Sequence, residues 1–519
     1  MLFNSVEFLF LFLPIVLLGY WGACRVPDVR YRKIWLTLAS LVFYGWWNPW
    51  LLLLLATSIL GNFYCGGVVL AQKRQGGLKA ARLVVITGFA FNIALLAYFK
   101  YAGFLLANLT LLTGWPNVEA NIILPLAISF FTFQQIAYLA DTFEGKVERY
   151  ALIDFTLFVS FFPQLIAGPI VHHKELVSQF NHTNLSLRHE NFSVGFTFLV
   201  IGLMKKILIA DNIDTVAAPV FDSGLETPGL IESWLAVLSF TLGIYFDFSG
   251  YSDMAVGLAR MFGVKLPYNF NSPYKSTSII DFWRRWHITL SNFLRDYLYI
   301  PLGGNRRGQA RRYINVFITM LLGGLWHGAS WTFVAWGGLH GLFIIINQQW
   351  EKRFARKSVL GRPLSQALTL LVVMIAWVFF RAGSFDQALN VLTGMAGMNG
   401  WISEAIATSL QNTYLAEQYA EGGLANLIRP SSLRNNIGEI FPFFLMAVGV
   451  IVALFAPNSQ TFIENIGENI SRQTNTAISR FQFRLRWTPS IHWAAILMAG
   501  FICCITAMSE VKAFVYFQF

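Results

Sequence analysis

The chain has 519 residues, of which 55% are hydrophobic and only 13% are charged. The formal net charge is +11, but Lys and Arg lie in short segments between apolar runs, where they set membrane topology by the positive-inside rule. This composition excludes a soluble multidomain protein, and the lack of a basic stripe excludes a nucleic-acid-binding protein. None of the four cysteines forms a C-x-x-C pair, so no disulfide framework is predicted.

Apolar runs of about 18–22 residues recur from end to end, which predicts an all-α, polytopic membrane protein. We expect one membrane domain over residues 1–519, with about 10–12 transmembrane helices. Both chain ends should lie outside, and the basic segments 25–33, 73–82 and 306–312 should lie inside. In the first third, apolar helices are expected at residues 1–21, 34–46, 50–70, 83–112 and 122–139.

The middle of the chain is less regular. Residues 155–170 are apolar but broken at Pro163 and at Gly168-Pro169, which favours a re-entrant or unwound segment over a plain span. Helices are expected at residues 191–209 and 233–248. Asp247 and Asp253 then lie near membrane depth, where they either orient a histidine, line a polar cavity or bond neighbouring helices.

Residues 275–299 mix aromatic and basic side chains, the pattern of an interfacial or re-entrant amphipathic helix. The following apolar stretch, 313–326, is long enough to carry His327 roughly 21 Å from the inner surface. His327 should therefore lie in the outer half of the bilayer, before a break at Gly328. Further helices are expected at 331–346, 368–380, 441–455 and 492–508, with an external segment at 384–438.

An ionisable residue at membrane depth is costly and marks a functional site by default. His327 is predicted to be a general base, because a neutral imidazole takes a proton from a hydroxyl as that hydroxyl attacks a carbonyl. The alternative is a histidine that packs helices together. The glycines at 323, 324 and 328 let backbone or ligand come close to it.

His287 is the second candidate, although a histidine on an amphipathic stretch also fits the headgroup level. Its neighbours Arg284 and Arg285 are candidates to hold phosphates, either of lipid or of a cytoplasmic cofactor. No metal site is expected. His172 and His173 are adjacent, and adjacent histidines face different ways on a helix, with no acidic ligand at a standard spacing.

Three motifs together resemble the membrane-bound O-acyltransferase (MBOAT) family, in the branch of the alginate O-acetyltransferase membrane subunit and its peptidoglycan and cellulose relatives. They are Asp281-Phe-Trp-Arg-Arg-Trp-His287, Arg295-Asp-Tyr-Leu-Tyr-Ile-Pro-Leu-Gly-Gly-Asn305 and Leu321-Leu-Gly-Gly-Leu-Trp-His-Gly-Ala329. The ending Tyr516-Phe-Gln-Phe519 is also similar. The resemblance implies helices around a central funnel that is thinnest near the catalytic histidine.

The resemblance places His327 at the family's catalytic histidine and His287 at its second functional position. Asp281 and Trp326, which lie in the same motifs, are expected to support them, as are Asp247 and Asp253. It further implies acetyl-CoA as the donor substrate and no permanently bound cofactor. The acetyl group then passes across the bacterial inner membrane, in a lipid environment, to a periplasmic SGNH-type partner that modifies a polysaccharide.

Two alternatives stay open at this stage. One is another acyl transfer within the family, of D-alanyl groups or to lipids. The other is a transporter for a glycan or lipid precursor, which would tolerate loss of the imidazole more easily than an enzyme. The sequence leaves open which polysaccharide is modified, and whether His327 forms a covalent acyl intermediate or acts only as a base.

Overall fold

The computed structural model describes residues 1–114, 122–181, 189–223, 225–354, 361–403, 430–464, 487–508, 512, 514 and 515, with only the backbone described at 430–439. Every regular element in these ranges is a helix, which confirms the all-α prediction. Five helical stretches are long and apolar enough to cross a membrane: Leu51–Arg74, Leu78–Thr113, His189–Phe221, Leu230–Met261 and Arg362–Arg381. Much of segment 384–438 and the ending 516–519 lie outside the described residues.

The first half of the chain supplies an N-terminal bundle. Its elements are η1 (Phe8–Phe12), α1 (Leu13–Cys24), α2 (Val29–Gly45), α3 (Leu51–Arg74), α4 (Leu78–Leu96), η2 (Ala97–Tyr101), α5 (Ala102–Thr113), α6 (Ile128–Glu144), α7 (Leu152–Ser160), α8 (Phe162–Leu165) and α9 (His173–Asn181). They are followed by α10 (His189–Leu203), η3 (Met204–Ala210) and α11 (Asp211–Phe221), which pack on the next long helix in the chain. The predicted break near Pro163 is confirmed, because α7 ends at Ser160 and the chain after Leu165 is irregular up to α9.

The second half supplies the long central helix and a second layer. Its elements are α12 (Leu230–Met261), η4 (Pro273–Lys275), α13 (Ile279–Trp283), α14 (Ile288–Leu294), η5 (Arg295–Tyr299), α15 (Gln309–His327), α16 (Trp331–Arg353), α17 (Arg362–Arg381), α18 (Phe385–Met395), α20 (Pro430–Phe455), α21 (Ser459–Glu464) and α23 (Ile491–Ala507). Residues 275–299, expected as one amphipathic helix, form several short ones.

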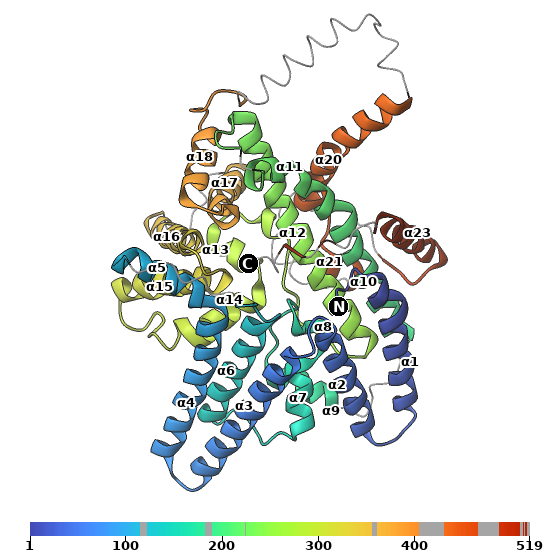
Figure 1. Cartoon of the computed structure of the whole chain (residues 1–519), viewed down its shortest axis with the longest axis vertical. Helices are drawn as coiled ribbons and strands as arrows, with labels where there is room; N and C mark the ends of the chain where they lie inside the picture. The colour runs from blue at the N-terminus through green and yellow to red at the C-terminus, as the bar shows by residue number, and fades with distance from the viewer. Residues whose placement is uncertain are drawn as a thin grey trace, which may run out of the picture.

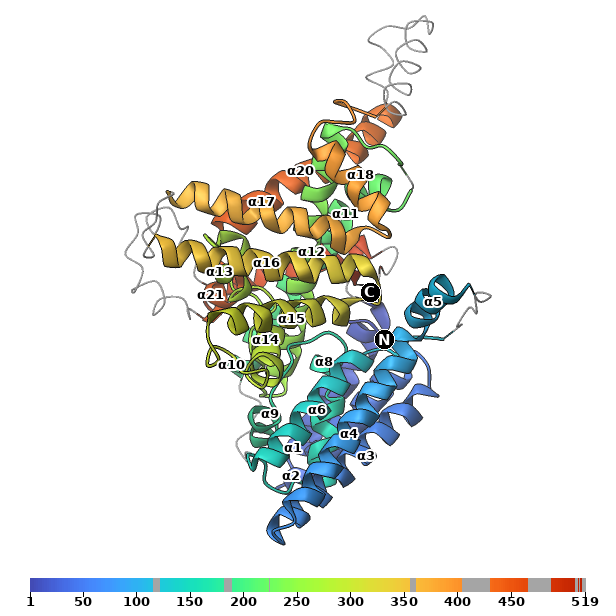
Figure 2. The same cartoon turned by 90° about the vertical axis from the view of Figure 1, so that its left-hand side faces the viewer.

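Helix α12 runs through the middle of the molecule (Figure 1). It packs on α10 backbone to backbone, because a Cβ at Gly195 would lie 2.6 Å from the carbonyl oxygen of Gly257, and one at Gly202 would lie 2.5 Å from that of Gly250. Small residues at such positions let membrane helices approach closely without a hydrophobic driving force. In Figure 2, α15, α16 and α17 lie side by side as a layer, beside a bundle that contains α3, α4 and α6.

The buried apolar side chains of the described residues form two large clusters. The first joins the N-terminal bundle to α14 and includes Trp326, whereas the second joins α12, α13 and α17 and includes Trp336 and Phe380. The last turn of α15 therefore lies at the boundary between the two cores. A polar side chain there is surrounded by apolar side chains from both halves of the protein.

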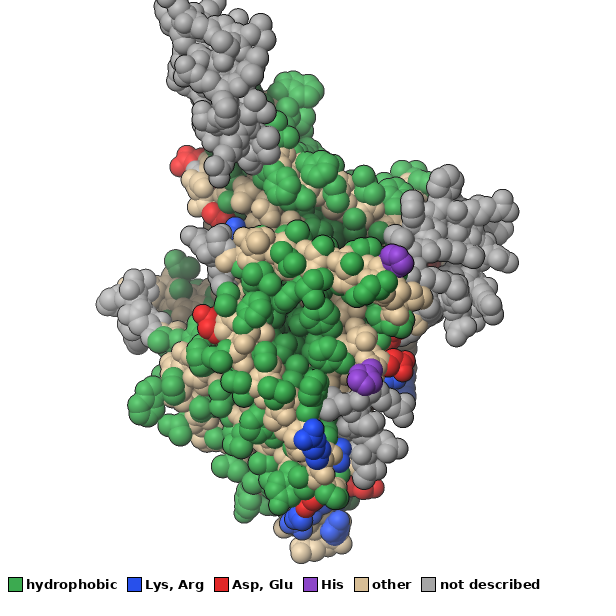
Figure 3. All heavy atoms as spheres, turned by 90° about the vertical axis from the view of Figure 1, so that its right-hand side faces the viewer, with side chains coloured by type: hydrophobic (Ala, Val, Ile, Leu, Met, Phe, Trp, Pro, Cys, Tyr) green, Lys and Arg blue, Asp and Glu red, His purple; other side chains and the backbone are tan. Residues whose placement is uncertain are grey.

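The outer surface carries many large hydrophobic side chains, among them Trp50, Leu111, Leu112 and Ile491, each at least three-quarters exposed. Figure 3 shows hydrophobic side chains over most of one face, with Lys and Arg gathered mainly toward its lower end. Exposing so much apolar area to water is unfavourable, and it is typical of a surface that contacts lipid. The protein is a multi-pass membrane protein.

In the helix pairs α3–α4 and α15–α16, the basic residues lie at one end and His327 lies at the other. At one end, the Lys352 Nζ donates to Gln309 Oε1 at 2.9 Å and Lys73 Nζ donates to the Phe143 carbonyl at 2.6 Å. At the other end, Lys100, which follows α4, contacts the carbonyl of His327. The basic starts of α4 and α15 and the end at His327 thus lie at opposite ends of these helices.

We expect cysteine labelling to place these ends on opposite sides of the membrane. In a background without the four native cysteines, Gln75→Cys should react only from the cytoplasm, because it lies in the basic turn between α3 and α4. Met398→Cys, after α18, should react from the periplasm, since this side chain is 78% exposed. Labelling of position 75 from the periplasmic side would refute the predicted topology.

Candidate active site

Helices α15 and α16 form a tight hairpin that positions His327. A Cβ at Gly324 would lie 2.2 Å from the carbonyl oxygen of Phe333, and one at Gly337 would lie 2.3 Å from that of Met320. The two backbones therefore touch, as predicted for the glycines of this motif. Helix α15 ends at His327 because Gly328 takes an extended conformation, with φ −155° and ψ 148°.

The His327 side chain lies among aromatic rings from both cores and is only 6% exposed. Its ring centroid is 5.0 Å from those of Trp326 and Trp336 and 5.3 Å from that of Phe380. The imidazole thus sits in a low-dielectric environment, which disfavours its charged form. A neutral imidazole is the form that acts as a general base.

A partly buried lysine holds the last turn of α15. Lys100 Nζ, from the π-helical turn η2, donates to the carbonyls of Trp326 at 2.7 Å and His327 at 2.9 Å. The hydroxyl of Tyr101 donates to the carbonyl of Leu325 at 2.9 Å. The last four carbonyls of a helix lack intrahelical partners, and a cation there also matches the helix dipole. These two side chains fix the backbone that carries His327.

The structure brings His287 next to His327, with ring centroids 6.5 Å apart. His287 is fully buried and precedes α14 in a left-handed conformation, with φ 42° and ψ 54°. This conformation costs a residue with a side chain about 1–3 kcal/mol and is concentrated at functional sites. Asn269 holds the turn, because its Oδ1 accepts from Thr289 Oγ1 at 2.7 Å and contacts His287 Nδ1 at 3.3 Å.

The predicted supporting residues fall into two groups. Trp326 lies at the site, stacked on Phe133 with ring centroids 5.3 Å apart. The three aspartates are held by cations instead. Asp247 pairs with Lys206 at 2.6 Å, Asp253 with Lys205 at 2.6 Å, and Asp281 with Arg285 at 2.9 Å.

These ion pairs define what the aspartates do in the fold. Asp247 Oδ2 also accepts from the backbone N–H of Val515, so it anchors the C-terminal segment to α12. Asp253 also accepts from Ser459 Oγ at 2.5 Å and lines a small polar cavity. Asp281 and Arg285 fix the α13 segment, where Arg285 also donates to the Asn271 carbonyl. Asp247 and Asp253 thus bond α12 to η3, whereas Asp281 bonds α13 to the turn that follows it.

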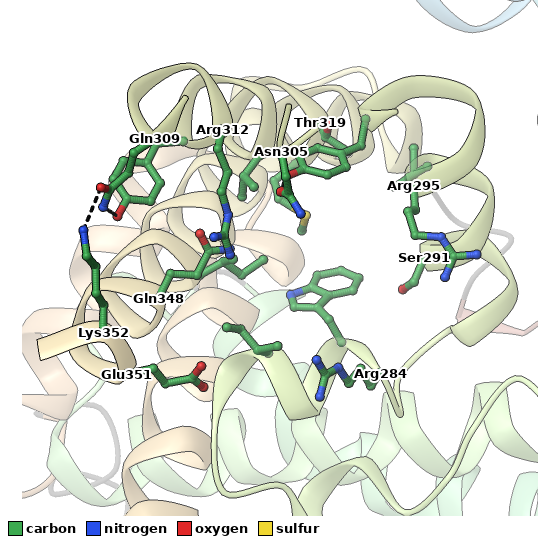
Figure 4. Close-up of a pocket in the computed structure, with 18 of the residues that line it drawn as sticks. Arg284, Ser291, Arg295, Asn305, Gln309, Arg312, Thr319, Gln348, Glu351 and Lys352 are labelled. Carbon is green, nitrogen blue, oxygen red and sulfur yellow. Dashed lines mark hydrogen bonds between the residues drawn. The ribbon is translucent and has the colours of Figure 1, made fainter. Parts of the chain in front are cut away.

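A cavity of about 840 Å³ opens between α13, α14, α15 and α16. Figure 4 shows Arg284, Arg295 and Arg312 at different sides of this space, with Ser291, Asn305, Thr319 and Gln348 also around it. Its volume is within the range of sites that bind small molecules or cofactors. Of the two arginines predicted to hold phosphates, Arg284 lines the cavity, whereas Arg285 points to Asp281 and is not among the lining residues.

The cavity is strongly basic. Its charged lining residues are Arg284, Arg295, Arg312 and Lys352, against the single carboxylate of Glu351. A hydrogen bond with Asp296 raises the pKa of Arg295, so this guanidinium stays charged. Burial raises the pKa of Tyr299, which keeps its hydroxyl protonated. Guanidinium groups suit bidentate binding of phosphate, so the charge of this lining is complementary to an anion.

Aromatic side chains connect the lining of the cavity to His327. Trp283, which lines the cavity, donates from Nε1 to His340 Nδ1 at 3.2 Å. The His340 ring lies 4.8 Å from that of Trp336, which in turn contacts His327. Ser291, another lining residue, donates its backbone N–H to the His287 carbonyl at 3.0 Å. Residues that line the basic cavity therefore contact His287 directly and His327 through His340 and Trp336.

Sequence reasoning missed four contributors to this site: Lys100, Asn269, Arg312 and Trp336. Lys100 carried one available signal, because it is a lone lysine within a long apolar run and such residues mark functional sites by default. Asn269 and Trp336 carried no such signal in the sequence, because only their contacts with residues distant in the chain place them at the site. Arg312 was assigned solely to membrane topology.

Buried histidines beside a basic cavity, in a protein with helices of membrane-spanning length, are typical of a class, that of polytopic membrane enzymes. The model of the MBOAT, membrane-bound O-acyltransferase family, matches residues 143–385. A peptidoglycan O-acetyltransferase of Helicobacter pylori is 38% identical over 100% of this chain and 98% of its own length. The chain belongs to the MBOAT family and is an acyltransferase.

Two other relatives mark how similarity varies within the family. The protein named "Probable alginate O-acetylase AlgI" of Pseudomonas aeruginosa is 42% identical over 79% of this chain and 78% of its own length. A teichoic acid D-alanyltransferase of Streptococcus thermophilus is 27% identical over 44% of this chain and 58% of its own length. Similarity to the O-acetylating relatives is thus both higher and more extensive.

Proposed function

We propose that this protein transfers an acetyl group from acetyl-CoA, bound on the cytoplasmic side of the bacterial inner membrane, for O-acetylation of a periplasmic or cell-surface glycan. The observation that carries the proposal is the pair of buried histidines next to a basic cavity. Relatives that are 38–42% identical are named for acetylation of peptidoglycan and alginate. These two polymers define the class of final acceptor.

In this proposal the cationic lining of the cavity binds the phosphates of the donor and orients its thioester toward the histidines. The acceptor hydroxyl attacks the thioester carbonyl, so a C–O bond forms and the C–S bond breaks. His327 takes the hydroxyl proton and returns it to the departing sulfur, which leaves as a thiol. Holding both reactants in one dry site lowers the entropic cost of their encounter.

The acceptor at this site is either the glycan itself or a carrier that passes the group on. We propose the second route, in which a periplasmic SGNH-type partner receives the acetyl group and modifies the polysaccharide. A test is co-purification and acetyl transfer with an SGNH-type protein encoded beside this one. Transfer to the glycan by the membrane protein alone would remove the partner from the proposal.

D-alanyl transfer is the competing acyl chemistry, and the lower, partial similarity to the D-alanyltransferase disfavours it. A transporter is the competing class. Reconstituted protein supplied with labelled acetyl-CoA on the side of the basic loops distinguishes acetyl transfer from both alternatives. Release of free CoA together with acetylated product supports the acetyltransferase, whereas an absence of thioester cleavage by the folded protein supports D-alanyl transfer or transport of a precursor.

Substitution of Arg284 and substitution of its neighbour Arg285 should have different effects. Arg284→Gln and Arg312→Gln should each raise the KM for acetyl-CoA by about 10-fold, since loss of a charge-assisted hydrogen bond costs about 1.5–3 kcal/mol. Arg285→Gln should leave this KM unchanged and lower thermal stability instead, because Arg285 pairs with Asp281 and Asn271. The measurement is steady-state kinetics with acetyl-CoA beside a melting curve for each variant.

The Arg285 variant is the matched control for loss of one positive charge in this segment. An unchanged KM in both Arg284→Gln and Arg312→Gln would mean that the donor binds elsewhere. A raised KM in Arg285→Gln at full stability would mean that this arginine reaches the donor through a movement of α13.

A further inference from the structure

Three side chains with metal-binding atoms meet at the end of α6, away from the two active-site histidines. Asp141 lies in the last turn of α6, and His172 and His173 precede and begin α9. The Asp141 Oδ2 atom lies 2.6 Å from His172 Nε2 and 3.0 Å from His173 Nε2. One donor atom from each residue lies within 4.8 Å of the other two.

The two adjacent histidines converge because they are not both helical. After the break at Gly168-Pro169 the chain is irregular, and helix α9 begins only at His173. Adjacent side chains on one helix would diverge, which is why the sequence predicted no site here. The break therefore turns both imidazoles toward Asp141, a residue about thirty positions earlier in the chain.

The residues around the cluster orient its donor atoms. Tyr150 Oη lies 2.8 Å from His173 Nδ1, so it can fix the tautomer that leaves Nε2 free to bind a metal. Tyr297 Oη donates to Asp141 Oδ2 at 2.7 Å. Partners of this kind, bonded to the second nitrogen of a histidine or to a carboxylate, are usual around metal ligands.

The burial of the three side chains and the charges around them also affect whether a metal ion can bind. The side chains of Asp141 and His173 are almost fully buried, whereas that of His172 is 33% exposed, which leaves an entry path. The Lys146 ammonium lies 3.5 Å from Asp141 Oδ1 and would repel a cation. It is 55% exposed and also pairs with Glu144, so it is free to turn toward solvent.

We propose that Asp141, His172 and His173 form a zinc site, with water or another ligand at a fourth position. Two imidazole nitrogens and one carboxylate oxygen are a common ligand set for Zn²⁺. Tetrahedral zinc, with bonds of about 2.0–2.2 Å, holds its donor atoms about 3.4 Å apart. The distances from Asp141 Oδ2 to the two histidine nitrogens, 2.6 Å and 3.0 Å, are shorter than this, so zinc binding requires small shifts of these side chains.

The place of the site in the fold indicates what the metal does. It joins the end of α6 to the irregular segment before α9 and, through Tyr297, to η5. Arg295 and Tyr299 of η5 line the basic cavity. A zinc ion at this place would hold one wall of the cavity against the N-terminal bundle. This structural role is independent of the proposed reaction at the histidine pair.

The test is the metal content of the full-length protein, purified in detergent with a tag that contains no histidine. Elemental analysis should find about one zinc per chain. Asp141→Asn and His173→Ala should lose it, whereas His189→Ala, at the exposed start of α10, should retain it. Tyr150→Phe should weaken zinc affinity by about 10–100-fold, since it removes only the supporting hydrogen bond.

Two outcomes overturn the site. One is a well-folded wild-type protein that contains no zinc and whose melting temperature does not rise when Zn²⁺ is added after chelation. The other is equal zinc content in wild type and in a folded Asp141→Asn variant. Because the His327→Ala variant should keep its zinc, failure of the zinc site and failure of the proposed function give different results.

Discussion

Replacing His327 by alanine is expected to reduce acetyl transfer at least ~10²-fold, the usual contribution of a general base. The imidazole is the group at the boundary of the two cores that can accept the proton of the attacking hydroxyl. Alanine is the strongest helix former, so α15 should persist and the protein should reach the membrane in normal amounts. The measurement is O-acetyl content of the glycan beside the quantified membrane level of each variant.

Two further variants separate catalysis from packing. His287→Ala should impair transfer less completely, because in the proposed mechanism His327 and not His287 takes the proton. His340→Gln removes another fully buried imidazole of the same aromatic cluster but keeps an acceptor for Trp283. It should retain most activity. Normal acetylation by a well-expressed His327→Ala protein would refute the enzyme mechanism and favour the transporter.

Replacing Lys100 by methionine is expected to lower kcat by about 10- to 100-fold while leaving the KM for acetyl-CoA unchanged. Without the ammonium group, the carbonyls of Trp326 and His327 lose a hydrogen-bond donor, which costs about 1–3 kcal/mol. The last turn of α15 should then loosen, and small displacements of a catalytic group have effects of this size on rate. Steady-state kinetics on the purified variant provide the measurement.

Lys275→Met is the matched control, because Lys275 Nζ also donates to a backbone carbonyl, that of Ala456, but lies outside the lining of the basic cavity. This variant should lower stability without the same loss of kcat. Equal losses of kcat in both variants would mean that Lys100 supports the fold in general and does not position His327.

The sequence alone determined the fold class and the choice of His327 and His287. The membrane supplies the physical reason, since apolar runs of spanning length and isolated ionisable residues stand out strongly against lipid. The sequence also predicted the helix breaks near Pro163 and Gly328, because proline and glycine change the local backbone conformation. The helix expected at residues 83–112 is confirmed as one helical stretch, Leu78–Thr113, made of α4, η2 and α5.

Only the tertiary structure decided which polar residues act together. Asp247, Asp253 and Asp281 had the right chemistry to orient a histidine, yet their carboxylates pair with Lys206, Lys205 and Arg285. Local sequence cannot choose between such partners, because the choice depends on which helices cross.

The crossing of helices also explains why the sequence did not predict the contact of Lys100 with His327 or that of Asp141 with His172. Lys100 lies more than two hundred residues before His327, and Asp141 lies about thirty before His172. Helix spacing rules relate residues three or four positions apart and carry no information on such long-range pairs. The sequence therefore determined which side chains are costly to bury, and the packing of the helices decided what each of them binds.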